Sequence, residues 1–82
     1  MNQGEKFDVE ISRHAKQRMK LYGINESDIN YVIANGVKSD LGENKFSYIA
    51  NIKSHKFPLK VVCKIRNEEC LIITSFPLKR GL

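Results

Sequence analysis

Residues 57–76 read FPLKVVCKIRNEECLIITSF, and this stretch decides the fold. Two apolar runs flank the polar residues Asn67 and Glu68, which predicts a β-hairpin with strands over 57–66 and 70–76. Side chains alternate between the faces of a sheet, so pairing the strands about this turn predicts one largely apolar face. We expect that face to contain Leu59, Val61, Cys63, Ile65, Cys70, Ile72, Thr74 and Phe76, of which only Thr74 carries a hydroxyl.

Two amphipathic helices are predicted upstream of the hairpin. Ser12 and Gly23 are suitable ends for the first helix, and Asn25 and Gly36 for the second, because side-chain oxygens cap helix starts and glycine accommodates helix ends. Apolar residues recur at helical spacing within each segment, so each helix has one face for the core. These residues are Ala15, Met19 and Tyr22 in the first helix and Ile29, Val32 and Ile33 in the second.

Further alternating segments complete the expected fold. Residues 37–41 and 46–52 predict two more strands, and 7–11 a short strand or an extended lead-in. The sequence therefore predicts an α+β fold with two N-terminal helices packed on a four-stranded, mainly antiparallel sheet. We expect residues 1–82 to form a single domain, with 1–8 as a lead-in and 77–82 as a short basic tail.

The net charge of +5 is unevenly distributed along the chain. Residues 11–22 contain four basic residues and no acid, and residues 53–82 contain seven basic and two acidic residues. If these two regions meet in the fold, their combined field attracts a polyanion such as RNA. The alternative is a solvated surface that only keeps the protein in solution. Contact between the two regions would favour RNA.

Several classes of protein are not supported by the sequence. No apolar stretch is long enough for a signal peptide or a membrane span, and the two cysteines lie in apolar runs, so we expect a cytoplasmic protein with no membrane partner. The acidic residues are scattered, whereas metal-dependent nucleases need converging carboxylates. No glycine-rich nucleotide-binding motif is present. We therefore expect no metal and no cofactor.

His14 and Arg18 are the strongest candidates for chemistry. They are four residues apart, so both project from one side of the first predicted helix, next to its apolar stripe. Histidine exchanges protons near neutral pH, and arginine donates paired hydrogen bonds to phosphate. Together they suit metal-independent cleavage of a phosphodiester. The alternatives are a surface histidine, and an arginine that is solvated or paired with Glu10 or Asp28.

Other polar residues are weaker candidates. Thr74 interrupts an apolar strand face and needs a hydrogen-bond partner, although threonine is common in strands for its shape alone. Several basic residues of the C-terminal third have two interpretations: they contact successive phosphates of an RNA strand, or they only form a solvent-exposed face of the sheet. These are Lys60, Lys64 and Arg66 on one strand, and Lys79 and Arg80 in the tail. We expect His55 to be solvated.

The run ISRHAKQRM at residues 11–19, followed by Gly23-Ile24 and later by LIITS at 71–75, resembles a family of short bacterial domains, the domain of unknown function 4258. The resemblance covers residues 9–77. Members of that family resemble the RelE and barnase-EndoU-colicin group of small ribonucleases, many of which are toxins. Many members carry a second arginine where Tyr22 stands here.

The resemblance implies a RelE- or barnase-like fold with His14, Arg18 and Thr74 in a nuclease-like cleft. The expected function is that of a toxin-type ribonuclease domain that cleaves free or ribosome-bound RNA by metal-independent acid-base chemistry. An antitoxin or immunity protein would then cover the cleft. The alternative is a non-catalytic module of the same fold that binds RNA or a protein. The oligomeric state stays open.

Overall fold

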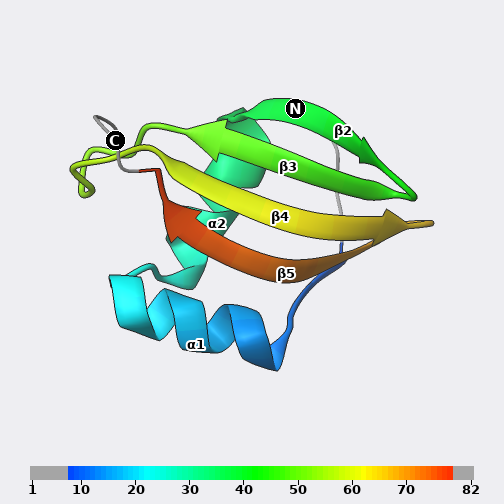
Figure 1. The fold of residues 1–82 in the computed structure, drawn as a ribbon, viewed down its shortest axis with the longest axis horizontal. Coiled ribbons are helices and arrows are strands. Elements are labelled where there is room, and N and C mark those ends of the chain that lie inside the picture. Colours follow the sequence, from blue (N-terminus) through cyan, green and yellow to red (C-terminus); the bar gives the residue numbers. More distant parts are fainter. Residues whose placement is uncertain (1–7, 79–82) are drawn as a thin grey trace.

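A computed structural model describes residues 8–78 of the chain. Within this range the order of elements is β1 (Asp8–Ile11), α1 (Arg13–Tyr22), α2 (Glu26–Asn35), β2 (Val37–Gly42), β3 (Lys45–Ala50), β4 (Leu59–Arg66) and β5 (Glu69–Pro77). All five strands belong to one sheet, in the order β1-β5-β4-β3-β2 (Figure 1). The β1 strand is parallel to β5, and the other neighbours are antiparallel. The fold is α+β, with a mixed sheet.

The prediction of a four-stranded, mainly antiparallel sheet is wrong. The additional strand is β1, which pairs with β5 through Asp8 opposite Glu69 to Ile11 opposite Ile72. These partners are about 60 residues apart in the sequence, and a parallel pair has no connecting turn whose residues would reveal it. The alternation over residues 7–11 therefore predicted an extended segment, but it did not identify β5 as the strand with which this segment pairs.

Both predicted helix starts and ends are confirmed. The Ser12 hydroxyl accepts a hydrogen bond from the Ala15 N–H at 3.1 Å, and Gly23 ends α1 in the left-handed region at φ 69°. Asn25 and Asp28 exchange side-chain to backbone hydrogen bonds in a capping box at the start of α2. These interactions lie within one helical turn of sequence, so local chemistry was sufficient to predict them.

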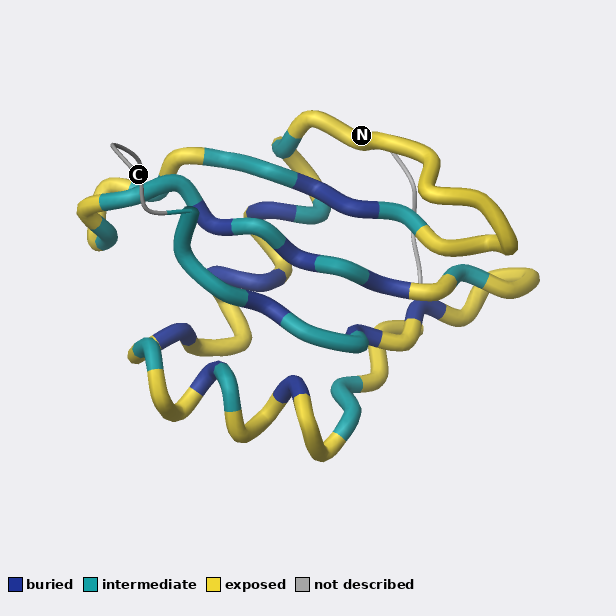
Figure 2. Tube along the Cα trace, in the orientation of Figure 1, coloured by how far each residue is buried: buried dark blue, intermediate teal, exposed yellow. Residues whose placement is uncertain are grey.

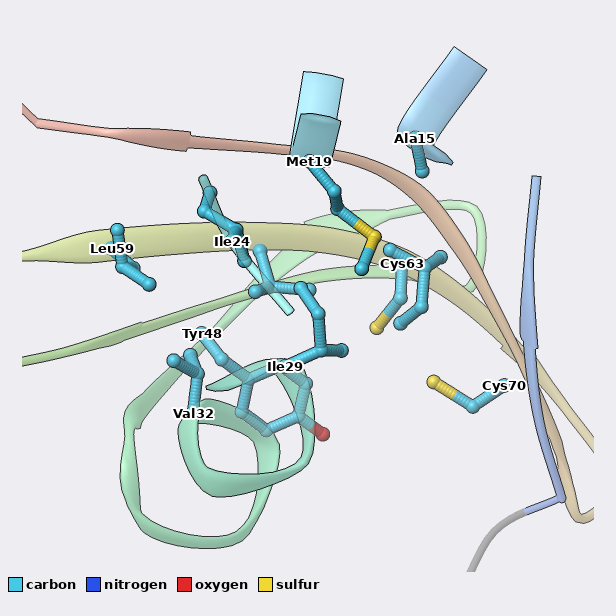
Figure 3. Close-up of a cluster of buried hydrophobic side chains, with 11 residues drawn as sticks. Ala15, Met19, Ile24, Ile29, Val32, Tyr48, Leu59, Cys63 and Cys70 are labelled. Atoms are coloured by element: carbon cyan, nitrogen blue, oxygen red, sulfur yellow. The ribbon is translucent and has the colours of Figure 1, made fainter. Parts of the chain in front are cut away.

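The core lies on one side of the sheet, between the strands and the two helices. Figure 1 shows α2 passing behind the sheet and α1 running alongside β5, and Figure 2 shows the buried positions of α1 on the side toward the strands. Figure 3 shows that Met19 of α1 and Ile29 of α2 reach the same apolar cluster as Cys63 of β4. The first helix thus lies beside β5, whose only charged residue is Glu69, whereas the basic residues of the C-terminal strands belong to β4, the next strand in the sheet.

A β-bulge in β5 changes which residues face the core. Val62 lies opposite Thr74, but the next residue of β4, Cys63, lies opposite Ile72, so Ile73 is an extra residue in β5. Beyond the bulge, Ser75 opposite Val61 faces the core and is fully buried. The prediction that Thr74 and Phe76 belong to the apolar core face is therefore wrong.

We call the face of β4 and β5 turned away from the core the open face. Its residues follow from the register of the two strands, in which directly opposed residues share a side. They are Lys60, Val62, Lys64 and Arg66 of β4, and Glu69, Leu71, Thr74 and Phe76 of β5.

Replacing Ser75 tests the bulge. The Ser75 hydroxyl is buried and has no hydrogen-bond partner among residues 8–78. We expect Ser75→Ala to raise the free energy of unfolding by about 1 kcal/mol, because it removes a buried polar group that is not satisfied. Urea denaturation measures the change, with the exposed Ser54→Ala as a control expected to stay within about 0.5 kcal/mol of the parent. If Ser75 faced solvent, neither substitution would change the free energy of unfolding appreciably.

Candidate functional site

His14 and Arg18 form a hydrogen-bonded pair on α1. The Arg18 Nε–H donates to His14 Nε2 at 3.4 Å, a long hydrogen bond at an exposed place on the helix. In this arrangement His14 Nε2 acts as the hydrogen-bond acceptor. Four N–H groups of the guanidinium remain available for an anion. Neither Glu10 nor Asp28 forms an ion pair with Arg18 within the described part of the chain.

The His14 and Arg18 side of α1 turns away from α2. On the opposite side, Lys16 lines a hollow together with Glu26 and Asn30 of α2. At 3.6 residues per turn, His14 and Arg18 each lie roughly 160° around the helix from Lys16. The position of Lys16 thus places the pair on the side of α1 that lies away from α2.

Ser12 sets the position of α1 along β5. Its N–H donates to Ile72 O at 3.0 Å, and its hydroxyl donates to Ile73 O at 3.2 Å. From this link, α1 and β5 run side by side in the same direction (Figure 1). At about 1.5 Å per helical residue and about 3.3 Å per strand residue, His14 comes level with Thr74, and Arg18 with the stretch just before Phe76.

Thr74 lies on the open face of β5, the strand beside α1. It is not a polar interruption of the core face, because the bulge directs it onto the open face. Thr74 forms no side-chain hydrogen bond with another described residue, so its hydroxyl is available to a ligand. Its exposure is intermediate.

Lys60 and Phe76 complete this end of the open face. They lie directly opposite each other in β4 and β5, two residues along each strand from Val62 and Thr74. The sequence pattern assigned Phe76 to the core and missed it as a site residue. Because Thr74 and Ser75 are consecutive polar residues, the sequence did not decide which of them faces the core. The one sign of an interrupted alternation was that a regular strand placed a threonine in the core.

The remaining predicted residues fall in three places. Lys64 and Arg66 lie on the open face, farther along β4 from Lys60. Lys79 and Arg80 lie outside the described residues. The prediction that His55 is solvated is wrong: its Nε2 lies 2.9 Å from Asp28 Oδ2, the oxygen that also accepts from the Asn25 N–H. This contact joins the loop before β4 to the start of α2 and leaves His55 outside the candidate site.

The arrangement offers a proton acceptor and a bidentate cation on α1, and a hydroxyl and an aromatic ring on the open face of β5. His14 supplies the acceptor, and Arg18 and Lys60 supply positive charge. Thr74 is a donor for a phosphate oxygen, and Phe76 is a surface on which a base can stack. Among residues 8–78, no three His, Cys, Asp or Glu side chains gather closely enough to hold a metal ion. No helix in this range is long and apolar enough to cross a membrane.

The Ser12 link has a measurable contribution to stability. We expect Ser12→Ala to lower the free energy of unfolding by about 1–2 kcal/mol, because it removes a helix cap and the hydrogen bond to Ile73 O together. Ser12→Thr keeps both groups and serves as the matched control, with most of the stability retained. Thermal unfolding followed by circular dichroism compares the three proteins. Equal loss in the two variants would contradict a role for the hydroxyl.

The fold and site define a small α+β domain with a polar, basic site beside an open sheet face. Residues 11–76 match the model of a family described as a domain of unknown function (DUF4258). The chain belongs to this family. No curated protein and no solved structure matches it.

Proposed function

We propose that this domain is a toxin-type endoribonuclease that cleaves RNA without a metal ion. The observation that carries the proposal is the exposed, hydrogen-bonded His14–Arg18 pair on α1, the helix that packs beside β5 with its Thr74 on the open face. A relationship of this family to RelE- and barnase-like ribonucleases, expected from the sequence, is part of the proposal. The surrounding positive charge favours a polyanionic substrate.

The chemistry follows from the groups present. The 2′-hydroxyl of a ribose replaces Arg18 as the donor to His14 Nε2, and His14 accepts its proton as the oxygen bonds to the adjacent phosphorus. Arg18 and Thr74 donate hydrogen bonds to the phosphate oxygens, where negative charge develops. The bond from phosphorus to the 5′-oxygen breaks, and solvent supplies the proton that this oxygen takes up. The products carry a 2′,3′-cyclic phosphate and a 5′-hydroxyl.

The proposal includes a setting for the reaction. Free or ribosome-bound RNA in the cytoplasm is the substrate, and an acidic antitoxin or immunity protein covers the basic site. Such a partner is expected because an uninhibited ribonuclease damages the cell that makes it. A partner of this kind would place carboxylates near Arg18 and Lys60.

Incubation of the purified protein with RNA in the presence of EDTA tests the function. We expect cleavage with EDTA present, 2′,3′-cyclic phosphate ends, and no cleavage of DNA of the same sequence, because DNA lacks the 2′-hydroxyl. Cleavage that needs magnesium, or that cuts DNA equally, would contradict the mechanism. Binding of RNA without cleavage, free or on ribosomes, would leave the non-catalytic module as the better description.

A further inference from the structure

The open face has a second feature at its far end, beyond the candidate site. A hollow of about 310 Å³ is lined by Glu10, Lys64, Arg66, Glu69, Cys70 and Leu71. In the sheet, Lys64 lies opposite Leu71, and Arg66 lies opposite Glu69. Glu10 of β1 borders Leu71 on its other side. The proposed cleavage chemistry uses none of these residues.

The chemistry of this hollow is mixed. Its four charged side chains include two donors, Lys64 and Arg66, and two acceptors, Glu10 and Glu69. None of the four forms an ion pair or a side-chain hydrogen bond with another residue in the described range. Leu71 is 38% exposed and provides an apolar floor. The hollow therefore presents donors, acceptors and an apolar surface that have no polar partners among residues 8–78.

A nucleobase has the matching properties. Its flat face is apolar enough to lie on a side chain such as Leu71, and its edge carries both acceptor atoms and N–H donors. The volume lies at the lower end of the range for small-molecule sites, which suits one base and excludes a folded partner. A simple anion site would not include two carboxylates.

The hollow is also at a suitable distance from the candidate site. The pair Val62–Thr74 and the pair Arg66–Glu69 are four residues apart along β4, which corresponds to about 13 Å. Lys64 lies between them and on the same face. A strand of RNA that follows β4 from Thr74 thus passes over a cation before it reaches the hollow.

We propose that this hollow is a base-binding subsite for an unpaired RNA strand whose reacting phosphate lies at Arg18 and Thr74. This inference rests on the proposed function and adds the class of substrate. The strand must be unpaired, because a duplex hides the faces of its bases and presents mainly phosphate and ribose. Glu10 and Glu69 accept hydrogen bonds from exocyclic amino groups, so the subsite favours a base that carries one over uracil.

Binding of short single-stranded RNAs tests the subsite. The strands carry a 2′-deoxyribose at the reacting position to prevent cleavage, and each strand in the series lacks the base at one position. We expect one position away from the reacting phosphate at which loss of the base weakens binding about 5- to 100-fold. Uracil at that position should bind more weakly than adenine, guanine or cytosine. The same sequence as a duplex should bind at least about tenfold more weakly than the single strand.

Substitution of Glu69 links the effect to the hollow. Glu69→Gln keeps the size of the side chain and removes its charge, and we expect it to weaken the preference against uracil, because a neutral amide oxygen is a weaker acceptor than a carboxylate. Glu26→Gln is the matched control, because it makes the same change on α2, on the core side of the sheet. An affinity that is unchanged by removal of any base and by Glu69→Gln would overturn the subsite but not RNA binding. An equal affinity for duplex and single strand would do the same. No binding of any RNA would overturn the proposed function as well.

Discussion

His14→Ala is expected to lower the rate of RNA cleavage by about 10²- to 10⁴-fold, the usual contribution of a positioned acid-base group. His14 is exposed and its side chain makes a single weak hydrogen bond, to Arg18. Its removal should therefore leave the fold and most of the RNA affinity intact. Single-turnover cleavage in EDTA measures the rate, and binding of a 2′-deoxy-blocked strand measures the affinity.

His55 provides a matched control, because it is the other histidine in the sequence. It contacts Asp28 and lies outside the candidate site, so His55→Asn should change stability more than the rate of cleavage. Arg18→Lys keeps the charge but loses the planar, two-pronged contact with phosphate, so it should also slow the reaction. A His14→Ala protein that cleaves as fast as the parent would exclude His14 as the general base, whatever the behaviour of the other variants.

The parts of the fold that the sequence predicted are those that depend on neighbouring residues. The caps at Ser12 and Asn25 act within one turn of helix, and the left-handed Gly23 ends α1 for a local steric reason. The partner of β1 could not be predicted in the same way, because its pairing with β5 joins distant segments. The spacing of apolar residues predicted that Met19 lies on the apolar face of its helix and Cys63 on the apolar face of its strand. Both residues lie in the same core cluster.

The candidate site shows the same division. The spacing of His14 and Arg18 predicted that they share one side of a helix, and the hydrogen bond between them agrees with it. The face to which Thr74 belongs depends on whether β5 contains an extra residue, and Ile73 carries no feature that marks a bulge. A shift of one residue moves every later side chain to the other face. The extra residue Ile73 therefore also explains why Phe76 was assigned to the core face.

Salt dependence provides the other large effect. In the proposed complex, RNA contacts four cations, namely Arg18 on α1 and Lys60, Lys64 and Arg66 on the open face of β4. Each phosphate that they neutralise releases counterions, with a slope of about −0.7 per contact for a single strand in a plot of log affinity against log salt. Four contacts predict a slope of about −3 and a loss of affinity of several hundred-fold for a tenfold rise in salt.

Removing two of these charges separates a contact with RNA from a general effect of net charge. The double variant Lys60→Ala, Lys64→Ala should reduce the slope by about 1.4, which corresponds to two lost phosphate contacts. The matched control, Lys53→Ala with Lys56→Ala, removes the same charge from the loop before β4, outside both strands, and should leave the slope near its original value. If both double variants changed the slope equally, the charge of the whole protein would account for the attraction and the open face would have no special role. A change confined to the strand variant would place the phosphates along β4, one strand away from the α1 side of β5.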